Sequence, residues 1–368
     1  YQESSRTISG SEVIETTSKT SYNGNYGLNA SWTIYNGSKR LNTIKQEKLN
    51  NQAANLDVET SENSIQESIA QIYIQILYAA ESVKVNENTL QVSIAQRDRG
   101  QELLNAGSIA KSDLAQLEAQ VSTDRYQLVT AQATLQDYKL QLKQLLELDG
   151  ENEMNVYLPA LSDENVLLPL PTKKDVYMSA LTLRPEIEAS KLSVEASELG
   201  IDIAKAGYLP TISLSAGIGT NHTSGSDFTF GEQVKNGWNN SIGVSVSVPI
   251  FNNRQTKSAV QKAKLQRETS LLSLLDEQKT LYKTIEGLWL DANSAQQRYA
   301  AANEKLRSTQ ISYDLISEQF NLGMKNTVEL LTEKNNLLQA QQEQLQAKYM
   351  AILNTQLLKF YQGDKLAL

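Results

Sequence analysis

The chain offers few side chains for catalysis or metal binding. It contains one histidine, His222, and no cysteine, which excludes a thiolate metal site and makes a multi-histidine site unexpected. The acidic run at 149–153 (DGENE) supplies oxygen ligands but lacks the alternating spacing of a calcium-binding loop. We interpret this run as a turn that ends a helix, and His222 as a solvated surface residue. No nucleophile–base pair or phosphate-binding loop is found in the sequence, so we expect neither enzyme activity nor a cofactor.

Composition narrows the class of protein further. The 368 residues carry a net charge of −8, so a general affinity for nucleic acid is not expected. Hydrophobic residues make up 40% of the chain and the mean hydropathy is −0.41, which is low for a compact globule. These values are typical of elongated helices buried along one stripe, or of a barrel with a wet interior. No run of residues has the length and apolarity of a transmembrane helix.

The sequence contains the same plan twice, 216 residues apart. Asn36 recurs as Asn252, Gly107 as Gly323 and Leu114 as Leu330, which indicates a duplicated half-domain. The expected first repeat, 1–150, contains strands within about 1–36, a long helix at 38–106, a tip turn at 107–111 and a shorter helix at 112–148. A linker at 151–172 leads to the second repeat, 173–368. That repeat is expected to contain a helix at 173–206, strands at 208–219 and 238–251, a long helix at 254–322, a tip turn at 323–327 and a shorter helix at 328–362. Because the first repeat lacks a counterpart of helix 173–206, we expect an N-terminal helix to be missing.

The expected strands alternate apolar residues with small polar ones. Within 238–250, even positions other than Asn240 are Trp, Ile or Val, and odd positions are mostly Ser or Gly. The segment 22–34 shows the same parity, and a polar loop at 220–237 should join strands 208–219 and 238–251. A soluble sandwich sheet has the same period, but its wet face usually carries Lys and Glu. Four such strands cannot close a barrel alone, so several chains would have to contribute. A girdle of aromatic residues near a membrane boundary is expected at Tyr22, Trp32, Tyr35, Tyr208, Trp238 and Phe251.

The long segments read as coiled-coil helices. Apolar residues recur every seven positions without proline from 254 to 322, and about 68 residues of helix span roughly 100 Å. Basic residues follow the strands, and the sequence leaves open whether they meet lipid phosphates or form a solvated helix face. Gly100 and Gly287 interrupt the long helices, and we interpret them as sites of close helix packing. The basic residues are Lys39, Arg40, Lys45, Lys48, Arg254, Lys257, Lys262 and Lys264.

Several motifs in order resemble the TolC family of outer-membrane efflux and secretion channels. LRPEIEASKLSVEASELGIDIAKAGYLPTISL (183–214) resembles the family's helix entering the barrel, and ASWTIYNG (30–37) and SVSVPIFNN (245–253) resemble its strand exits. NAGSIAKSDLAQLEAQ (105–120) and NLGMKNTVELLTEKNNL (321–337) resemble its two tips. The resemblance covers essentially the whole chain. A periplasmic adaptor and a soluble coiled-coil scaffold, both without a barrel, remain the alternatives.

The resemblance implies an α+β membrane protein. A homotrimer would form a 12-stranded transmembrane β-barrel, with four strands per chain, continuous with a long α-helical barrel. It would sit in the outer membrane of a Gram-negative bacterium, contact its lipid, and export substrates passively. Its partners would be a periplasmic membrane-fusion adaptor and an inner-membrane pump of the RND, ABC or MFS type; no nucleic acid and no cofactor are implied.

The resemblance also assigns residues to the tips. Asp113 and Lys325 match an acid and a base that pair between neighbouring protomers and hold the entrance shut, and Glu329 matches the first of two acids that narrow the pore. Thr332 stands at the position of the second acid. Phe320 stands where the family has an aromatic residue that carries a hydroxyl group. The turn residues expected to form the tips and to contact an adaptor are Gly107, Ser108, Gly323 and Met324.

Overall fold

The computed structural model describes residues 3–9, 12–18, 22–148, 154–159 and 166–366. The acidic run at 149–153, interpreted above as a helix-ending turn, lies outside the described residues. The fold divides into two units: residues 1–51 with 192–271, and residues 52–191 with 272–368. The first unit holds the strands, and the second holds most of the helical length.

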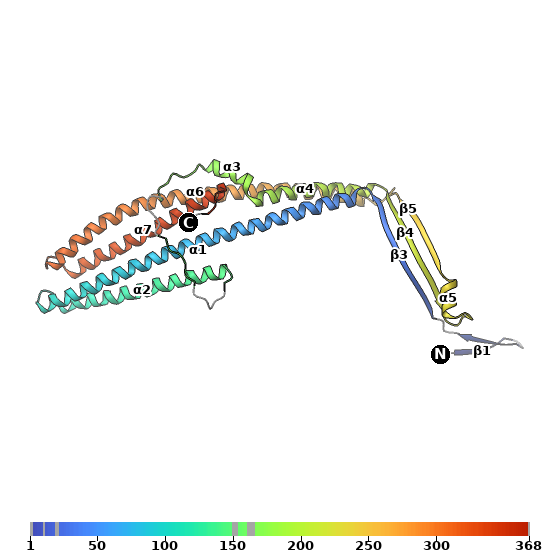
Figure 1. Ribbon diagram of the computed structural model, residues 1–368, viewed down its shortest axis with the longest axis horizontal. Helices are drawn as coiled ribbons and strands as arrows, with labels where there is room; N and C mark the ends of the chain where they lie inside the picture. The colour runs from blue at the N-terminus through green and yellow to red at the C-terminus, as the bar shows by residue number, and fades with distance from the viewer. Residues whose placement is uncertain (1–2, 10–11, 19–21, 149–153, 160–165, 367–368) are drawn as a thin grey trace. The chain divides into compact units, whose positions relative to one another are not determined.

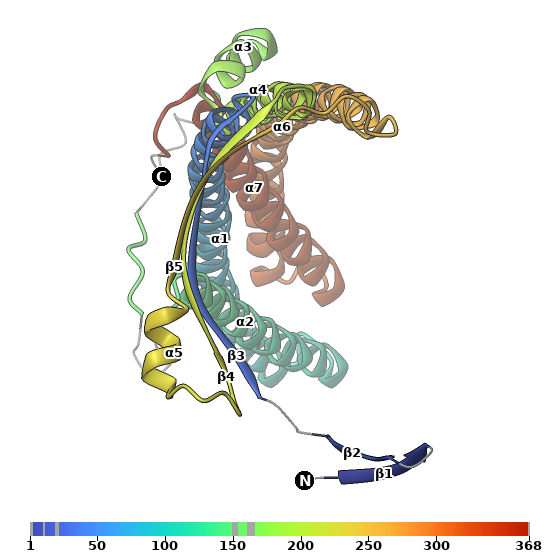
Figure 2. The same cartoon turned by 90° about the vertical axis from the view of Figure 1, so that its right-hand side faces the viewer.

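The first unit contains an antiparallel sheet in the order β3–β4–β5, formed by β3 (Asn23–Asn36), β4 (Thr211–Thr223) and β5 (Asn239–Ser247). The three strands curve together as one sheet (Figure 2). Its register aligns Trp32 with Leu214 and Leu214 with Val244. Trp32 and Val244 are exposed in the single chain. The sheet therefore presents an apolar face to its surroundings, as the alternation of residue types predicts.

A β-bulge interrupts this alternation near the end of β3. The register moves from Thr33, opposite Ser213, directly to Tyr35, opposite Ile212. Ile34, which simple parity places on the apolar face, is the extra residue of the bulge. An inserted residue shifts the side chains that follow it to the other face. Tyr35 therefore takes the register of the apolar face although its odd number places it with the polar residues.

The first repeat contributes fewer strands to this sheet than expected. Strands β1 (Glu3–Ser9) and β2 (Glu12–Ser18) pair with each other in a two-stranded sheet, and only β3 from the range 1–36 joins the larger sheet. Both segments carry charged residues, ESSRTIS and EVIETTS. Their sequences accordingly lack the uninterrupted apolar face that a lipid-facing strand requires.

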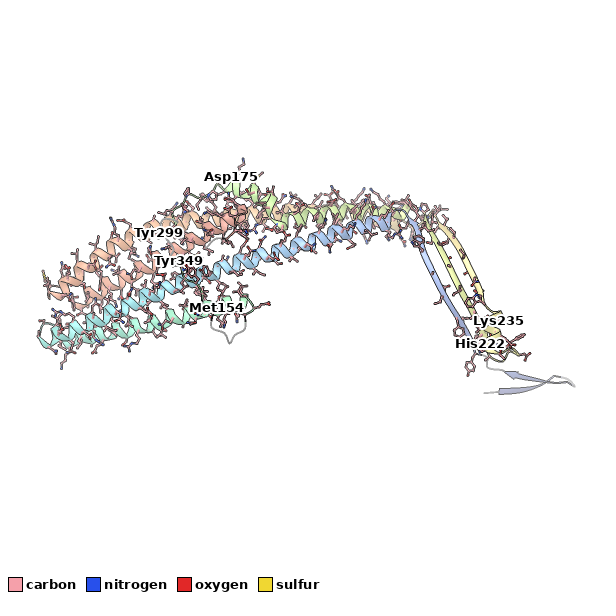
Figure 3. All side chains as sticks on the ribbon, in the orientation of Figure 1. Met154, Asp175, His222, Lys235, Tyr299 and Tyr349 are labelled. Atoms are coloured by element: carbon pink, nitrogen blue, oxygen red, sulfur yellow. The ribbon has the colours of Figure 1, made fainter. Side chains whose placement is uncertain are left out.

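The predicted loop at 220–237 is wrong in part. β4 continues to Thr223, and residues Phe230–Asn236 form a short helix, α5. Its capping residue Thr229 accepts a hydrogen bond from the backbone of Glu232, whose side chain accepts one in return from the Thr229 backbone. His222 lies in β4, at the end of the sheet that also carries Lys235 of α5 (Figure 3). His222 is not a freely solvated loop residue, because its ring packs edge-on against that of Phe230, with 5.0 Å between the two ring centroids.

Two helical hairpins make up most of the second unit (Figure 1), and the first residues of their long helices belong to the first unit. The first hairpin joins α1 (Lys39–Asn105) to α2 (Lys111–Leu145), and the second joins α6 (Gln255–Asn321) to α7 (Thr327–Gln362). Heptad positions of α6 are buried, including Ile285, Ala292 and Tyr299. Tyr299 of α6 and Tyr349 of α7 are both labelled in Figure 3. They belong to one hydrophobic cluster with Ala70 and Ile74 of α1. The spacing of seven therefore does mark the buried stripe.

The single helix predicted at 173–206 is two helices. α3 (Lys173–Leu183) is followed by the non-helical residue Arg184, and α4 (Pro185–Lys205) begins directly after it. Arg184 has an extended backbone, φ −78° and ψ 124°, because a following proline disfavours the helical conformation. Its buried guanidinium pairs with Glu67 at 2.8 Å and lies 3.6 Å from the ring centroid of Tyr361. The break thus directs a cation into the core of this unit.

None of the described helices combines the length and apolarity needed to cross a membrane. Among the described residues, no group of three or more His, Asp or Glu side chains is placed to hold a metal ion.

Candidate functional site: the two helical tips

The two tip turns have the same geometry. Gly107 and Gly323 adopt φ of +72° and +73°, the left-handed conformation that glycine tolerates best. The amides of Gly107 and Ser108 donate to Leu104 and Leu103 at 2.9 and 2.8 Å. In the second repeat, Gly323 and Met324 donate to Phe320 and Gln319 at the same two distances. These paired hydrogen bonds define a Schellman motif at the end of each long helix.

A small hydrophobic cluster stabilises the region just behind the turns. Leu117 of α2, Phe320 of α6 and Leu330 of α7 are each at most 2% exposed and pack together. Phe320, which cannot donate a hydrogen bond, is therefore part of the core of the tips. The cluster joins the two hairpins within one chain.

Gly100 of α1 permits this close packing. A Cβ atom built at Gly100 would lie 2.4 Å from Leu117 Cδ1, a distance that a real side chain cannot adopt. The interpretation of Gly100 as a site of close helix packing is confirmed. Gly287 differs, since no other described element lies within 4 Å of a Cβ atom built there.

Asp113 caps the helix to which it belongs. It is the third residue of α2, and its Oδ2 accepts a hydrogen bond from the backbone N–H of Ala110 at 2.9 Å. A carboxylate here satisfies a backbone donor and interacts favourably with the positive end of the helix. Its other oxygen has no hydrogen bond in the described structure.

Lys325 and Glu329 form a pair within the second tip. Lys325 Nζ donates to Glu329 Oε1 at 2.5 Å. Glu329 also completes a capping box, since its backbone N–H donates to Asn326 Oδ1 at 2.9 Å and its Oε2 accepts from the Asn326 backbone at 3.2 Å. The hydrogen bond from Lys325, followed by that from Asn326, lowers the pKa of the Glu329 carboxyl below its ordinary value.

Within the single described chain, no ion pair joins Asp113 to Lys325. The structure instead brings together the two residues of the same tip, Lys325 and Glu329. The two predicted latch charges are therefore both engaged locally, Asp113 in a helix cap and Lys325 in a pair between the tip turn and the first turn of α7.

The second tip carries the more apolar surface. Leu322, Met324 and Val328 are 75%, 70% and 59% exposed. Their counterparts 216 residues earlier are Ala106, Ser108 and Ser112. The two turns are alike in backbone and different in surface chemistry.

A buried ion pair, which the sequence analysis did not predict, links the two hairpins further along the helices from the tips. Lys334 of α7 forms an ion pair with Asp124 of α2, and Ser93 of α1 donates to the same carboxylate oxygen. Gln120 donates to the other oxygen at 2.9 Å. The charged side chains are 4% and 1% exposed, and burial lowers the pKa of Lys334 although Asp124 opposes this shift. We call Ser93, Asp124 and Lys334 the buried triad.

The predicted aromatic girdle belongs to the strand-bearing unit. Its members lie at or next to the ends of the sheet, apart from Trp32, which sits within the apolar face. All are exposed in the single chain: Tyr22, Trp32, Tyr35, Tyr208, Trp238 and Phe251.

Comparison with known proteins places this architecture in a family. The model of the outer membrane efflux protein family matches residues 1–147 and 176–363. The chain belongs to this family, so it is an outer-membrane protein and neither a periplasmic adaptor nor a soluble scaffold. The family predicted from the sequence is confirmed.

Individual relatives are distant in sequence and close in fold. The chain is 24% identical over 333 residues to the outer membrane efflux protein BepC of Brucella suis, covering 90% of the chain and 70% of BepC. It is 25% identical over 311 residues to the outer membrane protein TolC of Escherichia coli, covering 80% of the chain and 60% of TolC. A crystal structure of CusC superposes with a TM-score of 0.80 at 19% identity, covering 99% of the chain and 82% of CusC. The chain thus spans about 60–70% of the length of these two curated relatives.

Proposed function

We propose that the chain is one subunit of a trimeric outer-membrane channel that passively exports substrates delivered from the periplasm. It would serve as the exit duct of a tripartite efflux pump or a type I secretion system. The observation that supports this most is the sheet β3–β4–β5, whose apolar face is exposed and whose outer edges are unpaired among the described residues. In lipid, unpaired backbone groups cost several kcal/mol each, so the sheet must continue into neighbouring copies.

Four strands per subunit would give the 12-stranded barrel of the proposal. The described sheet supplies three of these strands, and the fourth would pair along a free edge. Strand β3 is 14 residues long, about 48 Å at roughly 3.4 Å per residue. Such a strand, tilted as in known barrels, is long enough to cross an apolar band of about 25 Å.

The tips would form the gated entrance. Asp113 of one subunit would pair with Lys325 of its neighbour, through the carboxylate oxygen that the helix cap leaves available and the remaining N–H groups of the lysine. Glu329 competes for the same lysine within its own subunit, which weakens the latch. An exposed ion pair is worth about 0.2–1 kcal/mol, and a lysine holds a carboxylate less firmly than an arginine fork. The exposed Leu322, Met324 and Val328 would offer the adaptor an apolar contact.

Single-channel conductance in planar bilayers tests the gate. Asp113→Ala and Lys325→Ala should each raise conductance, because each removes one partner of the latch. Lys111→Ala, which neutralises an exposed charge on the same tip, is the matched control and should behave as wild type. Unchanged conductance in both latch variants would remove the gate from the proposal.

Extraction tests the channel itself. The protein should require detergent for release from the envelope fraction and should migrate as an oligomer. A folded, monomeric protein that is soluble without detergent would contradict the barrel.

A further inference from the structure

Positive charge gathers in the strand-bearing unit where α1 and α6 begin. Residues 37–51 contain four Lys or Arg and one acid, and residues 252–267 contain five Lys or Arg and no acid. The whole chain, by contrast, carries a net charge of −8. Nine basic residues against one acid is therefore a local reversal of the protein's charge.

Eight of these nine residues are exposed and carry no ion pair in the described structure. Arg267 is the ninth, and it pairs with Glu198 and Glu268. We call the eight the basic belt: Lys39, Arg40, Lys45, Lys48, Arg254, Lys257, Lys262 and Lys264. Some lysines outside the belt do form ion pairs; Lys84 and Lys305, for example, pair with nearby glutamates at 2.6 and 2.7 Å.

Four residues of the belt stand where positive charge is least favourable: Lys39, Arg40, Arg254 and Lys257 lie in or directly before the first turns of α1 and α6. The first turns of α1 and α6 contain no acid, whereas those of α2, α3, α4, α5 and α7 each contain at least one. A helix start carries partial positive charge, so basic side chains there repel it unless an anion is nearby. Among the described residues, no ion pair offsets the charge of these eight side chains.

The two halves of the belt lie beside the same end of the sheet β3–β4–β5. α1 follows β3, and α6 follows β5 after a short connection. Both helix starts contact the segment that leads into β4: a Cβ atom at Gly37 would lie 2.8 Å from Leu209, and Thr256 Oγ1 donates to Gly207 at 3.3 Å. The exposed aromatic residues Tyr35 and Phe251 stand just before the two helix starts. The order along each chain segment is apolar strand, aromatic residue, basic helix start.

We propose that the basic belt binds the anionic head groups of phospholipids in the leaflet on the helical side of the barrel. Aromatic rings occupy the head-group level of a membrane, and lysine and arginine just beyond them reach the phosphates. The eight residues are spread over several helical turns and cannot converge on one phosphate ion. A surface of many head groups satisfies them together, which selects a lipid surface over a free anion. This inference rests on the membrane barrel of the proposed function.

Lipid retention by the purified, detergent-solubilised oligomer tests the proposal. The oligomer is incubated with phosphatidylglycerol or with phosphatidylethanolamine of the same acyl chains, and the bound lipid is counted by native mass spectrometry. The belt variant carries Lys39→Gln, Lys48→Gln, Lys257→Gln and Lys264→Gln. The control variant removes four exposed charges elsewhere, by Arg125→Gln, Lys174→Gln, Lys279→Gln and Lys283→Gln. A third arm adds inorganic phosphate to the wild type, matched in ionic strength with sodium chloride.

The wild type should retain at least tenfold more phosphatidylglycerol than phosphatidylethanolamine, since each basic residue near an anionic surface contributes about fivefold in affinity. The belt variant should lose most of this preference, the control variant should keep it, and phosphate should displace no more lipid than the salt control. Equal retention of the two lipids by the wild type, or equal loss in both variants, would overturn the proposal. Displacement by phosphate above the salt control would do the same in favour of a free-anion site.

The outcomes remain separate from those of the proposed function. A barrel that fails is seen before lipid is added, as a monomer that needs no detergent. If the belt variant does not assemble, the comparison of the two lipids on the wild-type oligomer still decides the question.

Discussion

Replacing Lys334 with methionine should destabilise the contact between the two hairpins strongly. The change leaves the Asp124 carboxylate buried at 1% exposure with hydrogen bonds from Ser93 and Gln120 but no cation. Removing one partner of a buried ion pair costs about 3–5 kcal/mol, because the remaining charge is desolvated without compensation.

The double variant Asp124→Leu/Lys334→Met should recover most of the loss. Replacing both charges with apolar groups of similar size is commonly neutral or stabilising, so the two single effects should be far from additive. The matched control is the pair of Lys305 on α6 and Glu343 on α7, at 2.7 Å and with both side chains more than 40% exposed. Removing either partner of that pair should cost no more than about 1 kcal/mol.

Hydrogen exchange measured by mass spectrometry on the assembled oligomer reads this effect locally. A loss of about 3–5 kcal/mol accelerates exchange through local opening by roughly 10²- to 5 × 10³-fold in peptides from α2 and α7 around the triad. The control pair should change exchange by less than about tenfold. Two results would refute the reasoning: single and double variants that exchange equally fast, or a Lys334→Met protein that exchanges like the wild type.

Three further predictions concern other sites. Gly100→Ala should lower the melting temperature, because overpacking against Leu117 costs about 1–3 kcal/mol. Gly287→Ala, where no other described element lies within 4 Å of the new Cβ atom, should leave the melting temperature unchanged or raise it. Equal shifts in the two variants would contradict this reasoning. Burial raises the pKa of Tyr361 to about 12, so its contribution to stability is complete below pH 10 and is lost as pH rises towards 12; Tyr361→Phe should remove that part of the alkaline loss in thermal unfolding. Because the lysine one turn earlier lowers the pKa of Glu329, its capping contribution should persist above the ordinary value and disappear only as pH falls through the lowered one; Glu329→Gln should abolish this acid dependence in exchange of the α7 N-terminal amides.

Periodicity in the sequence was sufficient to predict the long elements. The helices expected at about 38–106 and 254–322 correspond to Lys39–Asn105 and Gln255–Asn321 in the structure. Heptad spacing works here because a long helix that buries one stripe must repeat its apolar residues at that interval. The alternation of β4 and β5 carried equivalent information about the exposed face of the sheet.

The missed elements divide into those with a local signal and those without one. The break at Arg184 was readable from Pro185, and helix α5 from the Thr229–Glu232 capping box. The bulge at Ile34 leaves no such mark, since its residues continue the apolar alternation.

The buried triad could not be predicted in the same way. Asp124 and Lys334 are separated by 210 residues along the chain, and a charged residue on a helix is ordinarily exposed. Only the packing of α2 against α7 makes both side chains buried. Likewise, the sequence pointed to Lys325 as a tip charge but gave no indication that Glu329 engages it first.

The outer edges of β3 and β5, along which no described strand pairs, also affect how a newly made subunit assembles. Rows of unpaired amides and carbonyls are templates for any extended peptide nearby. A subunit that remains unassembled is therefore at risk of aggregating with unrelated chains, or of pairing incorrectly with other copies of the same chain. Rapid overproduction should aggravate this hazard, and slower synthesis, which lets each copy find its neighbours before the next arrives, should raise the yield of correctly assembled protein.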